Sequence, residues 1–265
     1  MIVIEDLQVR YGRKPPVLSI DRLKIDHGEF VVVIGRSGAG KSTLLRCIKG
    51  YVRPSRGNVV VGGVDLWAAP RRDQSRVKRR IGLVYQQFNL ARRLTVFQNV
   101  LCGTLGETSR WKSLFGWFSR EDRIGAWSAI CEVGLEEQVH QRADTLSGGE
   151  QQRVAVARVL AQQPSTILAD EPVSSLDPAW AEDVLGLIDR VQSHRHATLV
   201  MSLHQPHWAQ RFARRIIGLR DGSIVCDGPP EILTDDLLRE LYRGDSVIRF
   251  DTAPAGSQPV EVEVT

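Results

Sequence analysis

Residues 30–42 read FVVVIGRSGAGKS, and this stretch decides the fold. It opens with a β-branched run, which is typical of a strand buried on both faces of a parallel sheet. The remainder, GRSGAGKS, fits G-x-x-x-x-G-K-[ST], a loop that binds phosphates through its backbone N–H groups. A helix over residues 41–49 is expected behind the loop, with its positive end toward the phosphates. The stretch therefore predicts an α/β fold built around a phosphate-binding loop (P-loop).

The residues of this loop have predicted roles at a bound triphosphate. Lys41 is expected to bind the β- and γ-phosphates, and the Ser42 hydroxyl is expected to bind Mg²⁺. ATP and Mg²⁺ are thus the predicted ligands. Further contacts to ATP are assigned to the loop and the first helical turn, namely Gly35, Arg36, Ser37, Gly38, Ala39, Gly40 and Thr43.

Two more apolar runs, residues 166–169 and 197–202, end in polar residues. Because short apolar runs alternate with helical patterns, we expect a mostly parallel sheet covered by helices. Such sheets bind ligands at the C-terminal ends of their strands. Asp170 is expected to hold Mg²⁺ there, and Glu171 is expected to polarise the attacking water as general base. A purely structural alternative is that Glu171 caps the following turn.

The rest of the chain departs from this alternation. Short strands at residues 2–4, 7–10 and 58–63, separated by turns, predict an antiparallel β-subdomain beside the main sheet. We expect a single domain over residues 1–251 with an inserted α-helical subdomain at about 87–160. Its helix candidates are residues 96–101, 120–133 and 150–161. Residues 252–265 lack helical periodicity and are expected to form a mobile tail, with a short edge strand at 260–264 as the alternative.

Composition restricts the class of protein. With 42% hydrophobic and 25% charged residues, the chain of 265 residues is ordinary for a globular protein. Its apolar runs fall short of the roughly 18 residues of a membrane span, and its start lacks a signal-peptide pattern. We therefore expect a cytosolic chain that reaches a membrane only through a partner. Four scattered cysteines predict buried or partly buried thiols in a reducing compartment.

The charge pattern does not indicate nucleic-acid binding. A formal net charge of +4 is too small to argue for such a partner. The densest basic stretch, residues 71–80, is more typical of a solvated helix or loop. No nucleic acid is therefore predicted among the partners.

A second stretch, LSGGEQQR at residues 146–153, is also a predicted anion-binding helix start. Ser147 suits the N-cap of a helix, and Gly148 and Gly149 expose N–H groups at its positive end. With Glu150 this is also the pattern of an ordinary capped helix. Because one triphosphate needs only one cradle, a second anion site points to a second copy of the chain.

Taken together, the two motifs resemble the ABC-type ATPase family, whose signature sequence residues 146–153 match without departure. The resemblance extends from residue 2 to about 244. It implies a head-to-tail homodimer that buries two ATP molecules. Each ATP would lie between one subunit's P-loop and the signature of the other, contacted there by Ser147, Gly148, Gly149 and Glu150. Asp170 matches the Walker B aspartate, and His204 matches the switch histidine at the γ-phosphate.

Other positions match the family with alternatives or departures. Tyr11 lies where the family stacks a ring on adenine, although rings also simply pack at strand ends. Gln86 matches the Q-loop glutamine, which senses Mg²⁺ and couples to the membrane partner; Gln87 is the competing assignment. Asp177 ends the D-loop sequence SSLD, where alanine is commoner than Ser175. The second histidine, at position 207, is expected to be peripheral.

Residues 103–116 and 200–205 resemble bacterial phosphonate-importer ATPases, a group that includes phosphite and hypophosphite importers. Alternatively, the Trp- and Phe-bearing segment only packs the helical insert or docks its partner. The resemblance implies a translocating ATPase on the cytoplasmic side of the bacterial inner membrane. It would couple ATP-driven dimerisation and hydrolysis to uptake through two integral membrane permease subunits. A periplasmic or lipoprotein solute-binding protein would supply the solute.

Other functions remain as alternatives. One is a soluble ABC ATPase subunit of a phosphonate-degrading enzyme complex, and another is an importer ATPase for a different small solute. DNA-repair factors usually carry coiled-coil or zinc-hook inserts and translation factors two ATPase domains, and the sequence shows neither. A non-hydrolysing binding module is disfavoured because Lys41, Asp170, Glu171 and His204 are all present.

Overall fold

The computed structural model describes residues 1–12, 14–106 and 118–243. Its main sheet has six strands in the order β10-β9-β3-β8-β7-β6. All neighbouring strands are parallel except β10, which runs antiparallel to β9. The strands are β3 (Phe30–Ile34), β6 (Ile81–Val84), β7 (Thr166–Asp170), β8 (Thr198–Ser202), β9 (Arg215–Arg220) and β10 (Ser223–Gly228). The predicted mostly parallel sheet is confirmed.

Strand β3 is shared by two hydrophobic cores, as its β-branched run predicts. Phe30, Val32 and Ile34 pack into one core, and Val31 and Val33 pack into the other. Helix α1 (Lys41–Lys49) follows the P-loop and lies in the second core. It begins after Gly40 and ends at Gly50, and both glycines have positive φ. The alternation along β3 therefore places α1 on one side of the sheet.

The predicted antiparallel layer is a four-stranded sheet in the order β2-β1-β4-β5. Its strands are β1 (Ile2–Val9), β2 (Leu18–Ile25), β4 (Arg56–Val61) and β5 (Val64–Asp65). The prediction of two separate strands at 2–4 and 7–10 is wrong, because β1 is continuous. Asp6 has φ 50, and the pairing with β4 shifts register between Glu5 and Gln8. This bulge lets one strand pass through two polar residues that suggested a turn.

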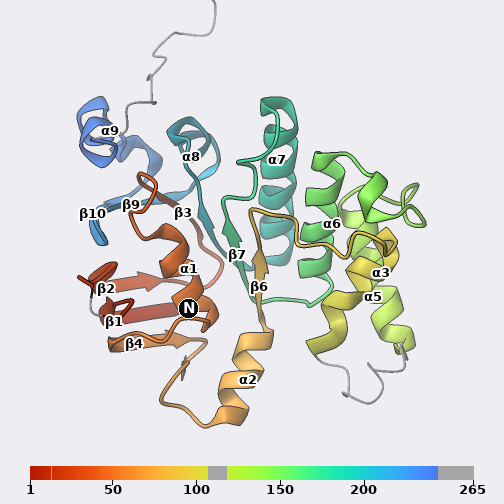
Figure 1. The fold of residues 1–265 in the computed structure, drawn as a ribbon, viewed down its shortest axis with the longest axis horizontal. Helices are drawn as coiled ribbons and strands as arrows, with labels where there is room; N and C mark the ends of the chain where they lie inside the picture. The colour runs from red at the N-terminus through yellow and green to blue at the C-terminus, as the bar shows by residue number, and fades with distance from the viewer. Residues whose placement is uncertain (13, 107–117, 244–265) are drawn as a thin grey trace, which may run out of the picture.

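The helical segment packs against the other side of the main sheet (Figure 1). It contains α3 (Val96–Leu101), α5 (Arg120–Glu132) and α6 (Gly148–Leu160). Each helix starts with a capping box, formed at Thr95, Ser119 and Ser147 respectively. Because Ser147 is the N-cap, α6 begins two residues before the predicted start at Glu150. These helices lie within residues 87–160, and the domain boundaries stay a prediction.

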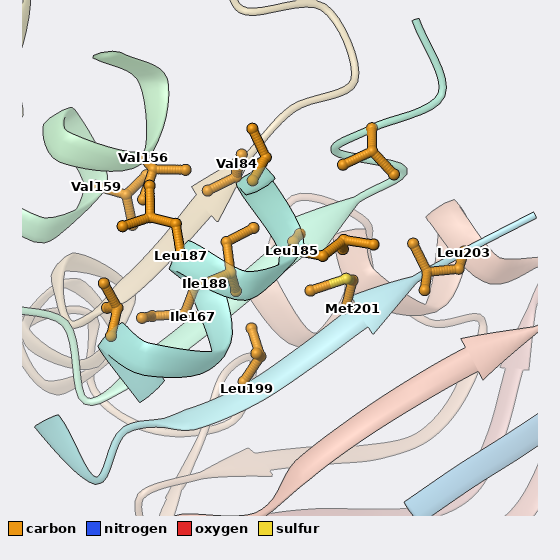
Figure 2. Packing of buried hydrophobic residues seen from close by; sticks show 14 of the residues in the cluster. Val84, Val156, Val159, Ile167, Leu185, Leu187, Ile188, Leu199, Met201 and Leu203 are labelled. Carbon is orange, nitrogen blue, oxygen red and sulfur yellow. The ribbon is translucent and has the colours of Figure 1, made fainter. Parts of the chain in front are cut away.

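Helix α7 (Pro178–Arg195) covers β7 and β8 on the same side of the sheet. Leu185 and Ile188 of α7 lie over Ile167, Leu199 and Met201 of the strands (Figure 2). This packing fixes the C-terminal ends of both strands, where the predicted catalytic residues lie.

The remaining helices are short, and α2 is solvated. These helices are α2 (Arg71–Arg79), α8 (Pro206–Phe212), α9 (Asp235–Leu241) and the 3₁₀ turns Cys102–Gly106, Ala143–Thr145 and Pro230–Ile232. The basic stretch forms α2, which buries none of its residues, so it is a solvated helix as predicted. Over the described ranges, no helix has the length and apolar character needed to cross a membrane. The predicted tail 252–265 and residues 107–117 of the Trp-bearing segment lie outside the described residues.

The cysteine prediction is correct for three of the four thiols. Cys47 and Cys226 are buried and Cys102 is partly buried, but Cys131 is exposed. Cys131 lies on the solvent-facing side of α5, whereas Ala126, Ala129 and Ile130 of that helix face the core.

Candidate functional site

The P-loop is held between neighbouring strands and left open at its middle. Gly35, Gly38 and Gly40 have φ of 144, 80 and 105. A Cβ on Gly35 would lie 2.1 Å from the Leu219 carbonyl oxygen, and one on Gly40 would lie 2.6 Å from Leu18 Cδ2. At Gly38 nothing lies within 4 Å. The loop therefore presents open space at its centre, as a phosphate cradle requires.

Gly35→Ala is expected to destabilise the fold. The new methyl group would overlap the Leu219 carbonyl, and alanine is strained at this φ. Backbone strain and overpacking together predict a loss of ~2–5 kcal/mol in the free energy of unfolding. Denaturant unfolding measures this loss, and Gly38→Ala, with open space around it, is the matched control. Equal stability of the two variants would contradict the steric argument.

Lys41 lies buried beneath the loop, with 4% of its surface exposed. Its Nζ donates to the carbonyl of Gly35 at 2.7 Å and to that of Arg36 at 3.2 Å. Glu171 Oε1 lies 3.6 Å from the same Nζ. The ammonium group is thus positioned between the loop and the carboxylate at the end of β7.

Ser42 and Asp170 are in direct contact. The Ser42 hydroxyl donates to Asp170 Oδ1 at 2.8 Å, and the buried Ser202 hydroxyl donates to the same oxygen at 2.9 Å. Ser202 reaches Asp170 because the two residues are register partners in the β7–β8 pair. A hydroxyl and a carboxylate beside a phosphate-binding loop are oxygen ligands that suit Mg²⁺. Ser202 was not among the predicted site residues, although it ends the predicted strand 197–202.

Glu171 and His204 line the same cavity, which has a volume of about 230 Å³. Glu171 has φ 48, a left-handed conformation that is unusual for a non-glycine residue. Its backbone N–H donates to the Ser202 hydroxyl at 3.0 Å, and its carbonyl accepts from Ser174 N–H at 3.3 Å. The turn is therefore closed by the Glu171 backbone, and the carboxylate points to Lys41 instead. His204 is held by Tyr242, whose hydroxyl donates to the His204 carbonyl at 3.0 Å.

The signature residues 147–150 form the first turn of α6. Ser147 Oγ accepts from the Glu150 N–H at 3.3 Å, and Ser147 N–H donates to Glu150 Oε2 at 2.8 Å. Gly148 is exposed, whereas Gly149 is buried. Helix α6 packs into the first core and α1 into the second, so the two helices lie on opposite sides of the main sheet (Figure 1). In one chain the signature turn and Lys41 thus belong to helices on opposite sides of the sheet.

The other predicted site residues are surface positions. Tyr11 is 45% exposed, and Asp177 is the exposed N-cap of α7 without a side-chain capping bond. Gln86 and Gln87 are both exposed beyond β6, so exposure does not decide between the two assignments. His207 is exposed beside Trp208, with ring centroids 4.5 Å apart.

The remaining P-loop residues differ in exposure. Arg36 forms an ion pair with Asp221 at 2.6 Å, Ser37 is exposed, and Ala39 and Thr43 are buried.

The sequence model described as ABC transporter matches residues 18–174. The chain belongs to the ABC transporter family. Among ABC relatives, the phosphonates import ATP-binding protein PhnC of Rhodopseudomonas palustris (strain BisB5) is 43% identical over 100% of this chain and 96% of its own length. PhnC 2 of Cupriavidus metallidurans is 44% identical over 93% of this chain and 88% of its own.

Solved ABC cassettes share the fold. The dimeric structure of the bacterial ABC transporter cassette MJ0796 has a TM-score of 0.75 and 33% identity, over 87% of this chain and 99% of that one. The same cassette in a post-hydrolysis state, bound to ADP and Pi, has a TM-score of 0.72 and 31% identity over the same shares. The ABC ATPase fold class is confirmed.

A groove that the sequence did not reveal lies between the sheet and the helical segment, and its lining includes Tyr85 and Asn89, on either side of Gln86 in the sequence. It has two compartments of about 510 and 260 Å³, and both are lined by Lys49, Tyr51 and Cys102. Arg158 supports its rim by donating to the carbonyls of Phe88 and Asn89, at 3.2 and 2.6 Å. Burial raises the pKa of Tyr85, another lining residue, to about 12. The groove therefore offers aromatic and cationic groups next to the segment that carries Gln86.

The buried Lys49 predicts that the free energy of unfolding depends on pH. Burial, with repulsion from Lys78, lowers the pKa of Lys49 from 10.5 to about 8. Between these two values the unfolded chain binds more protons, so the free energy of unfolding should rise with pH in that window. Thermal unfolding from pH 7 to 10 should show this rise in the wild type and not in Lys49→Met. Parallel curves for the two proteins would contradict the assignment.

Proposed function

We propose that this ABC chain is the ATP-hydrolysing subunit of an importer for phosphonate or a related reduced-phosphorus compound. The observation that carries the proposal is the meeting of Lys41, the Ser42–Asp170 pair and Glu171 at one edge of the sheet. This arrangement supplies the groups for phosphoryl transfer to water. The phosphonate assignment rests on the two relatives, which are named as phosphonate import proteins.

Hydrolysis follows from the residues around the loop. Lys41 exchanges the carbonyls of Gly35 and Arg36 for the β- and γ-phosphates of ATP, while the loop N–H groups bind phosphate oxygens. Ser42 and Asp170 would hold Mg²⁺, which would supply positive charge to neutralise the phosphates. Glu171 accepts the proton of the attacking water. His204, across the shared cavity, contacts the γ-phosphate.

The complete site requires two chains. Because α1 and α6 lie on opposite sides of the sheet, Ser147, Gly148, Gly149 and Glu150 serve the ATP of a second copy. A C₂ homodimer satisfies both sites at once. The dimeric MJ0796 cassette supports this arrangement.

The groove beside Gln86 is the proposed contact with the membrane partner. Its aromatic and cationic lining suits a helix with apolar and acidic residues. Two permease subunits would hold the ATPase dimer at the cytoplasmic face of the membrane. A solute-binding protein would deliver the solute outside, and no nucleic acid takes part.

Uptake and co-purification test this function together. A strain that lacks this chain should fail to take up a labelled phosphonate, and the wild type should restore uptake whereas Glu171→Gln should not. The tagged chain should co-purify with membrane subunits after detergent extraction. Recovery with a soluble phosphonate-degrading complex and no membrane subunit would favour that alternative. Restored uptake of a different solute only would overturn the phosphonate assignment.

A further inference from the structure

A tryptophan at the start of α7 lies directly on the signature. A Cβ on Gly149 would lie 2.6 Å from Cε3 and 2.8 Å from Cδ2 of Trp180. The indole ring therefore rests against the Cα of Gly149. This contact explains why Gly149 is buried while its neighbours Ser147 and Gly148 are exposed. Glycine at this position is thus required by packing within the chain, independently of any phosphate.

The contact between Trp180 and Gly149 is one of a row of three contacts that join the N-terminal part of α6 to residues 176–183. On one side of it, a Cβ on Gly148 would lie 3.4 Å from Leu176 Cδ2. On the other side, Arg153 Nη2 lies 3.7 Å from Asp183 Oδ2. The ion pair is partly exposed, so it adds little to stability by itself. The indole is the largest side chain in the row, and it links the signature to the start of α7, just after the loop that runs from Glu171 to Asp177.

Trp180 remains 39% exposed despite this packing. Large aromatic residues left half exposed next to a predicted interface are typical of binding hot spots. The proposed dimer directs the signature at the second chain, and residues 174–177 contact the signature through Leu176. The indole lies on the signature and follows the 174–177 loop by three residues.

We infer that Trp180 is a positioning residue for the composite ATP site. It holds the signature turn of α6 in register with the 174–177 loop, so that both segments meet the second chain as one unit. This inference rests on the proposed ATP-driven homodimer. It assigns to Trp180 a role separate from that of the groups that touch ATP.

The test uses the full chain with Glu171→Gln, in which ATP should trap the dimer. Adding Trp180→Ala should weaken ATP-driven dimerisation at least about tenfold in sedimentation, because a central tryptophan contact is lost. ATP binding by the dilute monomer should stay unchanged, since the P-loop lies on the other side of the sheet. Trp180→Phe, which keeps a flat ring on Gly149, should restore dimerisation. Trp127→Ala, which removes a tryptophan 45% exposed on α5, is the matched control and should leave dimerisation unchanged.

A second readout separates positioning from general stability. With Glu171 intact, Trp180→Ala should raise the protein concentration needed for half-maximal ATPase activity and leave kcat per dimer near the wild-type value. If Trp180→Ala lowers the melting temperature or monomer ATP affinity, Trp180→Leu replaces it in the test. Trp180→Leu keeps apolar bulk without the flat ring, and it should likewise weaken ATP-driven dimerisation. Equal dimerisation with and without Trp180, in a Glu171→Gln parent that does dimerise, overturns the inference. A parent that stays monomeric with ATP overturns the homodimer instead.

Discussion

Replacing Glu171 with glutamine is expected to lower the ATPase rate by ~10²–10⁴-fold, the usual contribution of a positioned general base. The carboxylate shares a cavity with His204 and lies 3.6 Å from the Lys41 ammonium. Glutamine keeps the size of the side chain and cannot accept the proton. ATP binding should persist, so the variant should accumulate as an ATP-bound dimer. Steady-state ATPase assays and size-exclusion chromatography with ATP measure the two effects.

The matched control changes a nearby carboxylate that does not face the cavity. Glu182→Gln on α7 removes one negative charge from a side chain that is 46% exposed and should keep most of the activity. If Glu171→Gln hydrolyses ATP at the wild-type rate, another group must act as the base. If it loses ATP binding as well, the carboxylate is needed to hold Lys41 rather than to take a proton.

Replacing Lys41 with alanine is expected to weaken ATP binding by about a hundredfold or more. A hydrogen bond to a charged group is worth about 1.5–3 kcal/mol, and the ammonium is expected to bind two phosphates. The variant also leaves the carbonyls of Gly35 and Arg36 without the Lys41 donor. Titration with a fluorescent ATP analogue measures the affinity.

Arg46→Ala is the matched control for the charge, because Arg46 is exposed on the same helix. It should bind ATP like the wild type. A Lys41→Ala protein that retains wild-type affinity, with an unchanged unfolding transition, would remove Lys41 from the phosphate site. A lower melting temperature in that variant would show instead that the lysine also stabilises the loop.

The parallel strands could be predicted from sequence because their signal is local. Residues 30–34 and 166–169 are near-continuous apolar runs, which are typical of a strand buried on both faces. β2 gave no such signal. Its buried residues fall at 18, 20, 23 and 25, so the alternation changes phase at Asp21 and Arg22. In β1 the alternation of buried and exposed residues also changes phase, at Glu5 and Asp6. These residues lie opposite the phase change of β2, because the two strands pair there. A defect shared by two strands cannot be recognised in either one alone.

The candidate site also contains residues that could be predicted from the sequence and residues that could not. The P-loop, Asp170, Glu171 and His204 stand out because their residue types follow strands at fixed spacing. Ser202 does not stand out in the sequence, because its contact with Asp170 depends on the register between β7 and β8. The indole on Gly149 depends on how two helices pack, which no spacing in the sequence encodes. Residues that follow strands at a fixed spacing were predictable, whereas contacts set by strand register or helix packing needed the structure.

The separation of α1 and α6 by the main sheet has a consequence for how the rate of ATP hydrolysis is controlled. Within one folded chain, the signature and the P-loop belong to helices that pack on opposite sides of this sheet. With the proposed two-chain site, turnover is expected to be second order in protein when the chains are dilute. The number of copies held together, rather than the conformation of any one copy, would therefore set how fast ATP is consumed.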